Sequence, residues 1–122
     1  MEAQKQHNAS LDRVLIDKRH QPRFKLEVKI RVSSRTSGLL RGHTVDISES
    51  GISAILRNEV FVGEVVELEF TLPFGPVNVY AIVRQRNAFR YGFQFVESIS
   101  TKAIIQATCR QLAVEQTLLG EN

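Results

Sequence analysis

The sequence predicts an all-β protein, a six-stranded antiparallel β-barrel followed by one C-terminal α-helix. Three observations support this fold class. Six short segments between residues 24 and 96 alternate apolar and polar residues, and turn residues separate them. The alternation leaves each segment one polar face, as in a small barrel whose outer side meets solvent. After residue 98 the apolar residues recur at helical spacing instead.

Length and composition are those of one soluble globular domain. The chain has 122 residues, of which 43% are hydrophobic and 24% are charged. No apolar run approaches the roughly 18 residues of a transmembrane helix, and residues 1–10 lack the apolar core of a signal peptide. We therefore expect a cytoplasmic protein. A single cysteine excludes an internal disulfide and a cysteine-rich metal site, and the three histidines show no metal-ligand spacing.

Charge is distributed unevenly along the chain. The net charge is +3, but residues 1–45 contain ten Lys or Arg against four Asp or Glu, and residues 46–122 contain six against nine. The basic half is the expected side for an anionic partner. A long nucleic acid usually requires a broader basic surface, so a small anion fits this imbalance at least as well.

The chain divides into an arm, a barrel and a helix. Residues 1–17 are predicted to form a flexible arm, of which residues 1–9 are polar and a short helix can start at Ser10. Residues 18–97 are assigned to the barrel. Residues 98–120 are assigned to a helix that packs on the barrel.

Three strands are predicted in the first half of the barrel. Alternation of apolar and charged residues from 24 to 32 indicates the first strand. A cluster of small turn residues at 33–38 leads to a second strand over 39–47. A serine–glycine turn at 50–51 then leads to a short apolar strand over 52–56.

The second half contributes three more strands. The segment 64–72 alternates well and ends at a Pro-Phe-Gly-Pro sequence that breaks the strand. The next strands are predicted at 77–83 and 89–96. Phe93 and Phe95 fall on the side expected to face the core.

The last element is an amphipathic helix of about 18 residues. Ile104, Thr108 and Leu112 fall on one side of it, with Cys109 beside them. Ser98 or Ser100 can cap its start and Gly120 can close its end. The helix covers one flank of the barrel or, alternatively, forms a dimer or partner surface, so a homodimer is possible. The thiol is predicted to be packed rather than reactive.

Two polar segments are expected to meet at one end of the barrel. Arg19 and Arg23 flank a proline just before the first strand, and guanidinium groups suit bidentate contacts with phosphate or guanine. If the first hairpin turns near residues 35–36, Arg23 lies opposite Ser48. Asp46 can accept hydrogen bonds from a guanine edge, Ser48 can donate to an anion, and Gly51 can adopt a positive φ. This set of groups predicts a purine-nucleotide site.

These residues resemble the motifs of the PilZ domain family, bacterial receptors for cyclic di-GMP. Arg19 and Arg23 match the family pattern R-x-x-x-R, and Asp46, Ser48 and Gly51 match [D/N]-x-S-x-x-G. Each motif alone is weak to moderate, but both in this order, one hairpin apart, are a strong signal. The resemblance implies a six-stranded PilZ-type barrel with a C-terminal helix that binds cyclic di-GMP at the arginine-rich hinge.

The resemblance extends over residues 17–115 and includes a Tyr-Gly-Phe-Gln-Phe segment at 91–95, similar to the family's sixth strand. Lys18 stands where many members have an arginine, and lysine lacks the flat stacking plane. The predicted ligand-binding residues are thus Lys18 together with the five motif residues. Lys18 can also offset the charge of a second, stacked dinucleotide, so one or two ligands per chain remain open.

Other interpretations remain at this stage. The motif residues can be ordinary turn residues, with Arg23 or Arg19 in a structural ion pair with Asp46. Arg84 and Arg86 either add to the basic site or are simply solvated, which is the favoured interpretation. The alternative functions are a small basic barrel that binds single-stranded nucleic acid and a PilZ-like interaction module whose ligand site is unused.

Catalysis is not expected, because no nucleophile has a neighbouring base and no paired carboxylates or metal ligands occur. We therefore expect no enzyme activity and no cofactor besides the dinucleotide ligand. Binding is expected to close the N-terminal arm over the barrel, and an unidentified downstream protein would read that change.

Overall fold

The computed structural model of the chain describes residues 21–118. These residues form seven strands and one helix. In chain order the elements are β1 (Phe24–Lys25), β2 (Lys29–Ser34), β3 (Gly38–Ile47), β4 (Gly51–Leu56), β5 (Val65–Leu72), β6 (Gly75–Asn87), β7 (Arg90–Phe95) and α2 (Ile99–Leu118).

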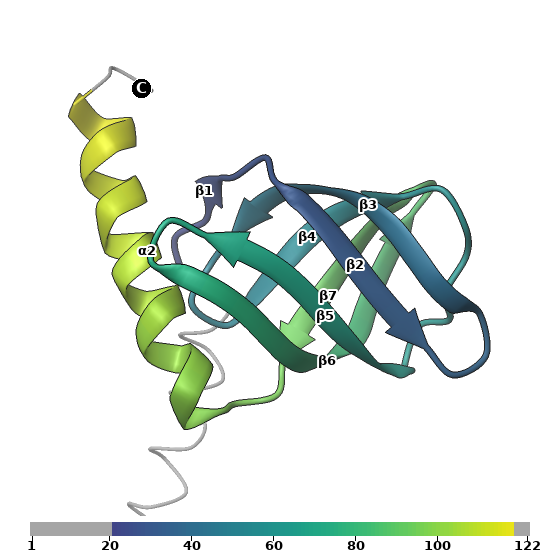
Figure 1. The fold of residues 1–122 in the computed structure, drawn as a ribbon. Coiled ribbons are helices and arrows are strands. Elements are labelled where there is room, and N and C mark those ends of the chain that lie inside the picture. Colours follow the sequence, from purple (N-terminus) through teal and green to yellow (C-terminus); the bar gives the residue numbers. More distant parts are fainter. Residues whose placement is uncertain (1–20, 119–122) are drawn as a thin grey trace, which may run out of the picture.

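Six of the strands close into an antiparallel barrel (Figure 1). The strands follow the order β3-β2-β5-β6-β7-β4, and the pairing of β4 with β3 completes the ring. The short strand β1 is additional and pairs with the end of β3. The predicted six-stranded antiparallel barrel with a C-terminal helix is therefore confirmed, with one extra strand.

The first predicted strand is divided in two. Phe24 pairs with Ile47, whereas Lys29 pairs with His43, so the β1–β2 segment contains one residue more than the β3 segment opposite it. Thr44 on β3 bridges the irregularity. Its hydroxyl accepts the Val28 N–H at 2.9 Å and donates to the Leu26 carbonyl, both in the segment between β1 and β2. The apolar alternation does not reveal such a bulge, because it records the face of each residue and not its partner.

The turns explain where the other strands end. The predicted break after β5 is a tight hairpin, in which Gly75 pairs with Leu72 at a φ of 142°. Glycine adopts this conformation without the steric penalty that a Cβ would bring. The strand β6 then runs to Asn87, beyond the predicted end at residue 83, because it pairs with β7 as far as Arg90.

The barrel interior is filled by the inward-facing residues of all six strands. Phe93 and Phe95 are buried as predicted, and Tyr91 on the same strand is 1% exposed. Aliphatic residues of the other strands surround them, including Ile30, Val32, Ile47, Ile52, Leu68 and Val83. Burial of this apolar surface is the main stabilising contribution to the fold.

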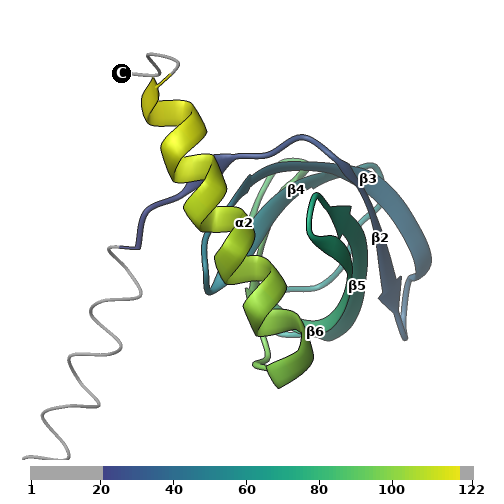
Figure 2. The ribbon, with the colours of Figure 1, turned by 60° about the vertical axis from the view of Figure 1, so that its left-hand side comes forward.

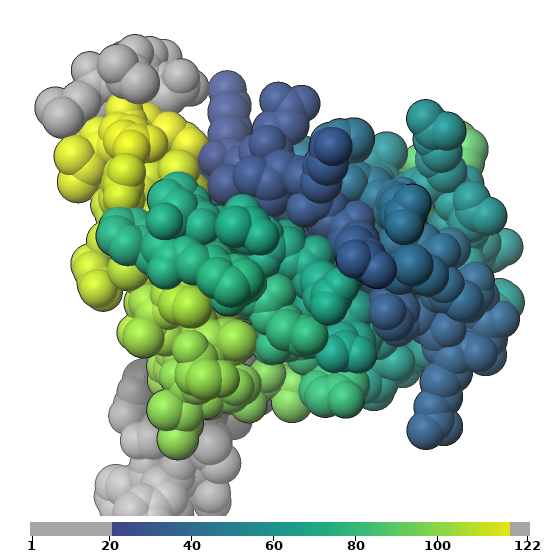
Figure 3. All heavy atoms as spheres, viewed as in Figure 1, coloured from purple at the N-terminus to yellow at the C-terminus, as the bar shows by residue number. Residues whose placement is uncertain are grey.

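The helix α2 covers one end of the barrel (Figures 1 and 2). Ile105, Thr108 and Cys109 are buried, and Ile104 and Leu112 pack against the core at its edge. Figure 3 shows α2 directly against the β5–β6 hairpin. The predicted apolar stripe thus packs on the barrel. Gly120, the predicted helix end, and the predicted arm over residues 1–17 lie outside the described residues.

The helix also holds β1 in place. The side-chain amide of Gln116 accepts the Lys25 backbone N–H at 3.2 Å and donates to the Lys25 carbonyl at 2.9 Å. This amide therefore pairs with β1 much as a neighbouring strand would. Because β1 directly follows Arg23, the helix contributes to the position of that arginine.

Cys109 is a packed thiol. Burial, together with the nearby Glu49 carboxylate and against the opposing effect of Arg23, raises the pKa of Cys109 to about 11. The thiol is thus protonated at neutral pH and is not a nucleophile. Across residues 21–118, no helix has the length and apolar character needed to cross a membrane.

Candidate functional site

The candidate site forms where the start of β1 meets the end of β3. The β1–β3 register pairs Phe24 with Ile47 and Lys25 with Asp46. Continued by one residue, this register places Arg23 opposite Ser48, as the sequence predicted. The structure brings these side chains together through antiparallel pairing across a hairpin, although they lie 25 positions apart.

Arg23 contacts three side chains. Its Nε and Nη2 donate to the same Asp46 oxygen, Oδ1, at 2.9 and 2.7 Å. Its Nη1 lies 3.3 Å from the Ser48 hydroxyl, and Nη2 lies 3.3 Å from the Ser53 hydroxyl. Even so, the Arg23 side chain is 44% exposed. The guanidinium group is therefore held in one orientation while part of it still faces solvent.

A second arginine reaches Asp46 from the opposite side. The Nη2 of Arg90, at the start of β7, donates to Asp46 Oδ2 at 2.8 Å. The Asp46 side chain is 17% exposed, whereas that of Arg90 is 50% exposed. One carboxylate thus orients two guanidinium groups that both face the surface. Arg90 and Ser53 were not predicted from the sequence, where the one signal for Arg90 is its outward position on the last strand.

The turn after β3 depends on Ser48. Its hydroxyl accepts the backbone N–H groups of Ser50 and Gly51, each at 3.2 Å, and its own N–H donates to the Gly51 carbonyl at 2.8 Å. Ser48 is 1% exposed. It therefore shapes the turn and also faces Arg23, and its role in binding an anion stays a prediction.

A positive φ was the predicted reason for glycine at position 51, and this prediction is wrong. Gly51 is not among the described glycines with positive φ, which are Gly38, Gly63 and Gly75. A Cβ on Gly51 would instead lie 2.3 Å from the Phe93 carbonyl oxygen. Glycine is needed here because β4 approaches β7 closely and not because the turn requires a left-handed residue.

An open cavity of about 700 Å³ lies over these residues, between β4 and the β6–β7 hairpin. This volume is within the range of about 300–1,000 Å³ found for small-molecule sites. Four arginines and a single carboxylate are the charged groups that line it: Arg23, Arg84, Arg86, Arg90 and Asp46. The cavity is thus strongly basic and suits an anionic ligand.

Arg84 and Arg86 belong to this lining, although they were predicted to be simply solvated. The Nε of Arg84 donates to Gln94 at 2.6 Å. Arg86 pairs with Glu59 and lies over the Tyr91 ring, 5.5 Å from its centroid. Both side chains are exposed, but these contacts hold them beside the cavity.

The remaining predicted ligand residues, Lys18 and Arg19, lie outside the described residues. Within residues 21–118, no group of three or more His, Cys, Asp or Glu could hold a metal ion. The chemistry of the described site is therefore that of fixed cations, one carboxylate and hydroxyl groups, which can bind phosphates and the polar edge of a base.

Comparisons with known proteins agree with this architecture. The model of the PilZ domain family matches residues 17–111. No curated protein matches the sequence. Among solved structures, the PilZ domain of YcgR from Escherichia coli, determined with c-di-GMP, is similar with a TM-score of 0.67 and 16% identity, over 84% of this chain and 96% of that chain.

Two further structures share the fold. The K. pneumonia MrkH–c-di-GMP complex is similar with a TM-score of 0.67 and 14% identity, over 80% of this chain and 52% of MrkH. Bacillus subtilis MotI/DgrA, an inhibitor of motility, is similar with a TM-score of 0.62 and 19% identity, over 75% of this chain and 49% of that protein. The present chain thus corresponds to about half of each of these two proteins. Because the family model matches most of its length, the chain belongs to the PilZ domain family.

Proposed function

We propose that this protein is a cytoplasmic receptor for cyclic di-GMP and not an enzyme. The principal support is the convergence of Arg23 and Arg90 on Asp46 beside a basic cavity. The similar YcgR and MrkH structures were determined with c-di-GMP. Arg23, Asp46 and Ser48 lie together in the described structure. The family resemblance assigns these same motif residues to cyclic di-GMP binding.

The two parts of the ligand would use different groups. Arginines around the cavity attract the two phosphates, because guanidinium forms paired, charge-assisted hydrogen bonds with phosphate oxygens. Asp46 Oδ1 already accepts two N–H groups of Arg23, whereas Oδ2 accepts one from Arg90 and keeps a further acceptor position. Asp46 can therefore accept an N–H group of guanine at Oδ2 while it keeps the arginines oriented.

Asp46→Ala tests this division. We expect this variant to lose selectivity for cyclic di-GMP over cyclic di-AMP, which has the same phosphate ring and a different base. Attraction of the phosphates should persist, because the arginines remain and a negative charge is removed. Calorimetry on both dinucleotides measures the ratio of affinities. An unchanged ratio would show that Asp46 does not read the base.

The wild-type titration tests the receptor assignment itself. Cyclic di-GMP should bind in preference to GTP and to a short single-stranded oligonucleotide. Equal or tighter binding of the oligonucleotide would favour a nucleic-acid barrel, and no binding of any probe would favour an interaction module with an unused site. The same titration gives the stoichiometry, and a ratio near two that falls to one in Lys18→Ala would support a stacked pair.

We further propose that ligand binding closes the segment before β1 and that a separate protein reads the closed state. Two phosphates would give Arg19 and Arg23 common partners and offset the repulsion between these cations. Ordering costs about 1–2 kcal/mol per fixed backbone residue, which the ionic contacts must exceed. Only differential affinity for the open and closed states can shift this equilibrium.

Hydrogen exchange with and without cyclic di-GMP tests the closure. Protection is expected to rise across residues 10–23 and across the turn at 46–51. The strands β5 and β6 should change little, because they lie in the closed barrel in either state. Equal protection of residues 10–23 with and without the ligand would place the conformational change elsewhere.

A further inference from the structure

A second basic surface lies outside the Asp46 cavity. In the β2–β3 register Arg31 is directly opposite Arg41, and Lys29 is opposite His43. The last paired residues of β3 and β4 are Gly42 and Leu56, so the same register continued by one residue places Arg57 beside Arg41. We call Lys29, Arg31, Arg41 and Arg57 the basic face. None of the four lines the Asp46 cavity.

Most cations of the basic face have no partner within the described part of the chain. All four side chains are exposed. Arg31 has one long ion pair, 3.6 Å to Glu69, and residues 21–118 provide no hydrogen-bond or ion-pair partner for Lys29, Arg41 or Arg57. Like charges directly opposite each other in a sheet are destabilising. The barrel therefore carries an arrangement that folding alone does not favour, and an anionic partner would compensate it.

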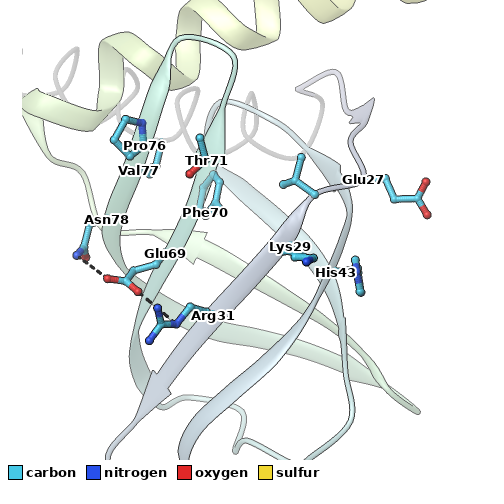
Figure 4. A pocket seen from close by; sticks show the side chains of 11 residues that line it. Glu27, Lys29, Arg31, His43, Glu69, Phe70, Thr71, Pro76, Val77 and Asn78 are labelled. Carbon is cyan, nitrogen blue, oxygen red and sulfur yellow. Dashed lines mark hydrogen bonds and ion pairs between the residues drawn. The ribbon is translucent and has the colours of Figure 1, made fainter.

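A hollow of about 950 Å³ adjoins this face (Figure 4). Its lining includes the apolar side chains of Val28, Phe70 and Val77. β2 pairs with β5 only as far as Ile30 and Phe70, because the chain before Ile30 turns away from β5 at the bulge between β1 and β2. In Figure 4, Arg31, Glu69 and Asn78 form a chain of polar contacts across β2, β5 and β6.

We propose that the basic face and this hollow bind an acidic helical segment of a protein partner. Adjacent strands lie about 4.7–4.9 Å apart, so Arg31, Arg41 and Arg57 form a row at roughly that spacing. Carboxylates three or four residues apart on a helix are separated by about 5–6 Å. One helix face can therefore present a carboxylate to each guanidinium, and an apolar residue beside them can enter the hollow.

Two observations favour a helix over other polyanions. Glu27 and Glu69 line the hollow beside the cations. A helix can place an apolar residue over these carboxylates, whereas a continuous phosphate backbone or an anionic headgroup layer would bring further negative charge past them. The exposed apolar side chains near the row include the aliphatic Leu39 and Ile55 and one aromatic, Phe89, whose carbonyl accepts the Leu56 N–H beside Arg57. A single ring does not form the series of stacking aromatics that single-stranded nucleic acid requires. This proposal does not depend on cyclic di-GMP binding.

The test uses the full chain and an alanine-based helical peptide of about 20 residues, long enough to hold a helix. Glutamates are placed three and four residues apart on one face, with a leucine beside them, and a matched peptide carries glutamines instead. Fluorescence anisotropy should show that the glutamate peptide binds and the glutamine peptide binds at least about fivefold more weakly. Amide chemical-shift changes should map to β2, β3 and the residues after β4.

Variants test the residues directly. The double variant Arg31→Glu/Arg41→Glu should lower affinity for the glutamate peptide at least about fivefold. The neutral double variant Arg31→Gln/Arg41→Gln should also weaken binding, and its unfolding temperature should equal or exceed that of the wild type, because like-charge repulsion is removed. Arg110→Glu, the same charge reversal on the exposed face of α2, should bind the peptide as the wild type does.

Three results would overturn the proposal. Equal affinity for the glutamate and glutamine peptides would exclude charge recognition. Unchanged peptide binding by the neutral double variant would exclude the basic face. Tighter binding of a single-stranded oligonucleotide or of phosphatidylserine vesicles, with loss in the same variants, would assign the surface to nucleic acid or to a membrane.

Discussion

Replacing Arg23 by alanine is expected to weaken binding of cyclic di-GMP by about ten- to a hundredfold. A hydrogen bond to a charged group contributes about 1.5–3 kcal/mol, and each 1.4 kcal/mol corresponds to roughly a factor of ten in affinity. In the described structure Arg23 donates to Asp46 and lies near two serine hydroxyls. The variant removes this organised donor, while Arg90 still pairs with Asp46. Calorimetry with cyclic di-GMP measures the loss.

Two further variants separate geometry from charge. Arg23→Lys keeps the positive charge but cannot offer paired donors in one plane, so its affinity should fall between those of the wild type and Arg23→Ala. Arg35→Ala removes an exposed arginine from the distal turn of the β2–β3 hairpin and should bind as the wild type does. Wild-type affinity in Arg23→Ala would mean that the dinucleotide binds elsewhere.

Folding stability should respond little to Arg23→Ala. The ion pair with Asp46 is partly exposed, and such pairs contribute about 0–1 kcal/mol. The unfolding temperature of the variant should therefore stay close to that of the wild type. A large decrease would indicate that Arg23 acts mainly in holding β1 against β3.

Gly51→Ala is expected to lower the stability of the fold strongly, although it adds only one methyl group to the motif. The added Cβ would lie 2.3 Å from the Phe93 carbonyl oxygen, and its next neighbours are also backbone atoms. Backbone cannot rotate away as a side chain can, so β4 and β7 must separate locally. Overpacking of this kind costs roughly 1–3 kcal/mol, which lowers the unfolding temperature by about 4–8 °C for each kcal/mol in a small domain.

The matched control is Gly92→Ala on the neighbouring strand. Its Cβ would meet Gln85 at 3.5 Å, an ordinary van der Waals contact, so stability should change by less than about 0.5 kcal/mol. Chemical and thermal unfolding of both variants measure the difference. If Gly51→Ala were as stable as Gly92→Ala, the close approach of β4 to β7 would not be the reason for glycine at position 51.

The sequence by itself determined the fold class and the central part of the site. Alternation of apolar residues identified the strands, because side chains of a strand point to opposite faces with a period of two. Motif spacing across one hairpin predicted that Arg23 lies opposite Ser48, and the β1–β3 register agrees with this prediction. The agreement also depends on the bulge, because the β2–β3 register alone would place Arg23 opposite Glu49 and the extra residue between β1 and β2 moves it to Ser48.

Only the tertiary structure decided which distant residues join this site. Arg90 is 44 positions from Asp46, and it reaches the carboxylate because β7 pairs with β4. Gly51 faces the Phe93 backbone for the same reason. The alignment of Arg31, Arg41 and Arg57 likewise depends on the registers of two strand pairs. Alternation specifies the face of each residue, but strand order and register follow from closure of the whole barrel.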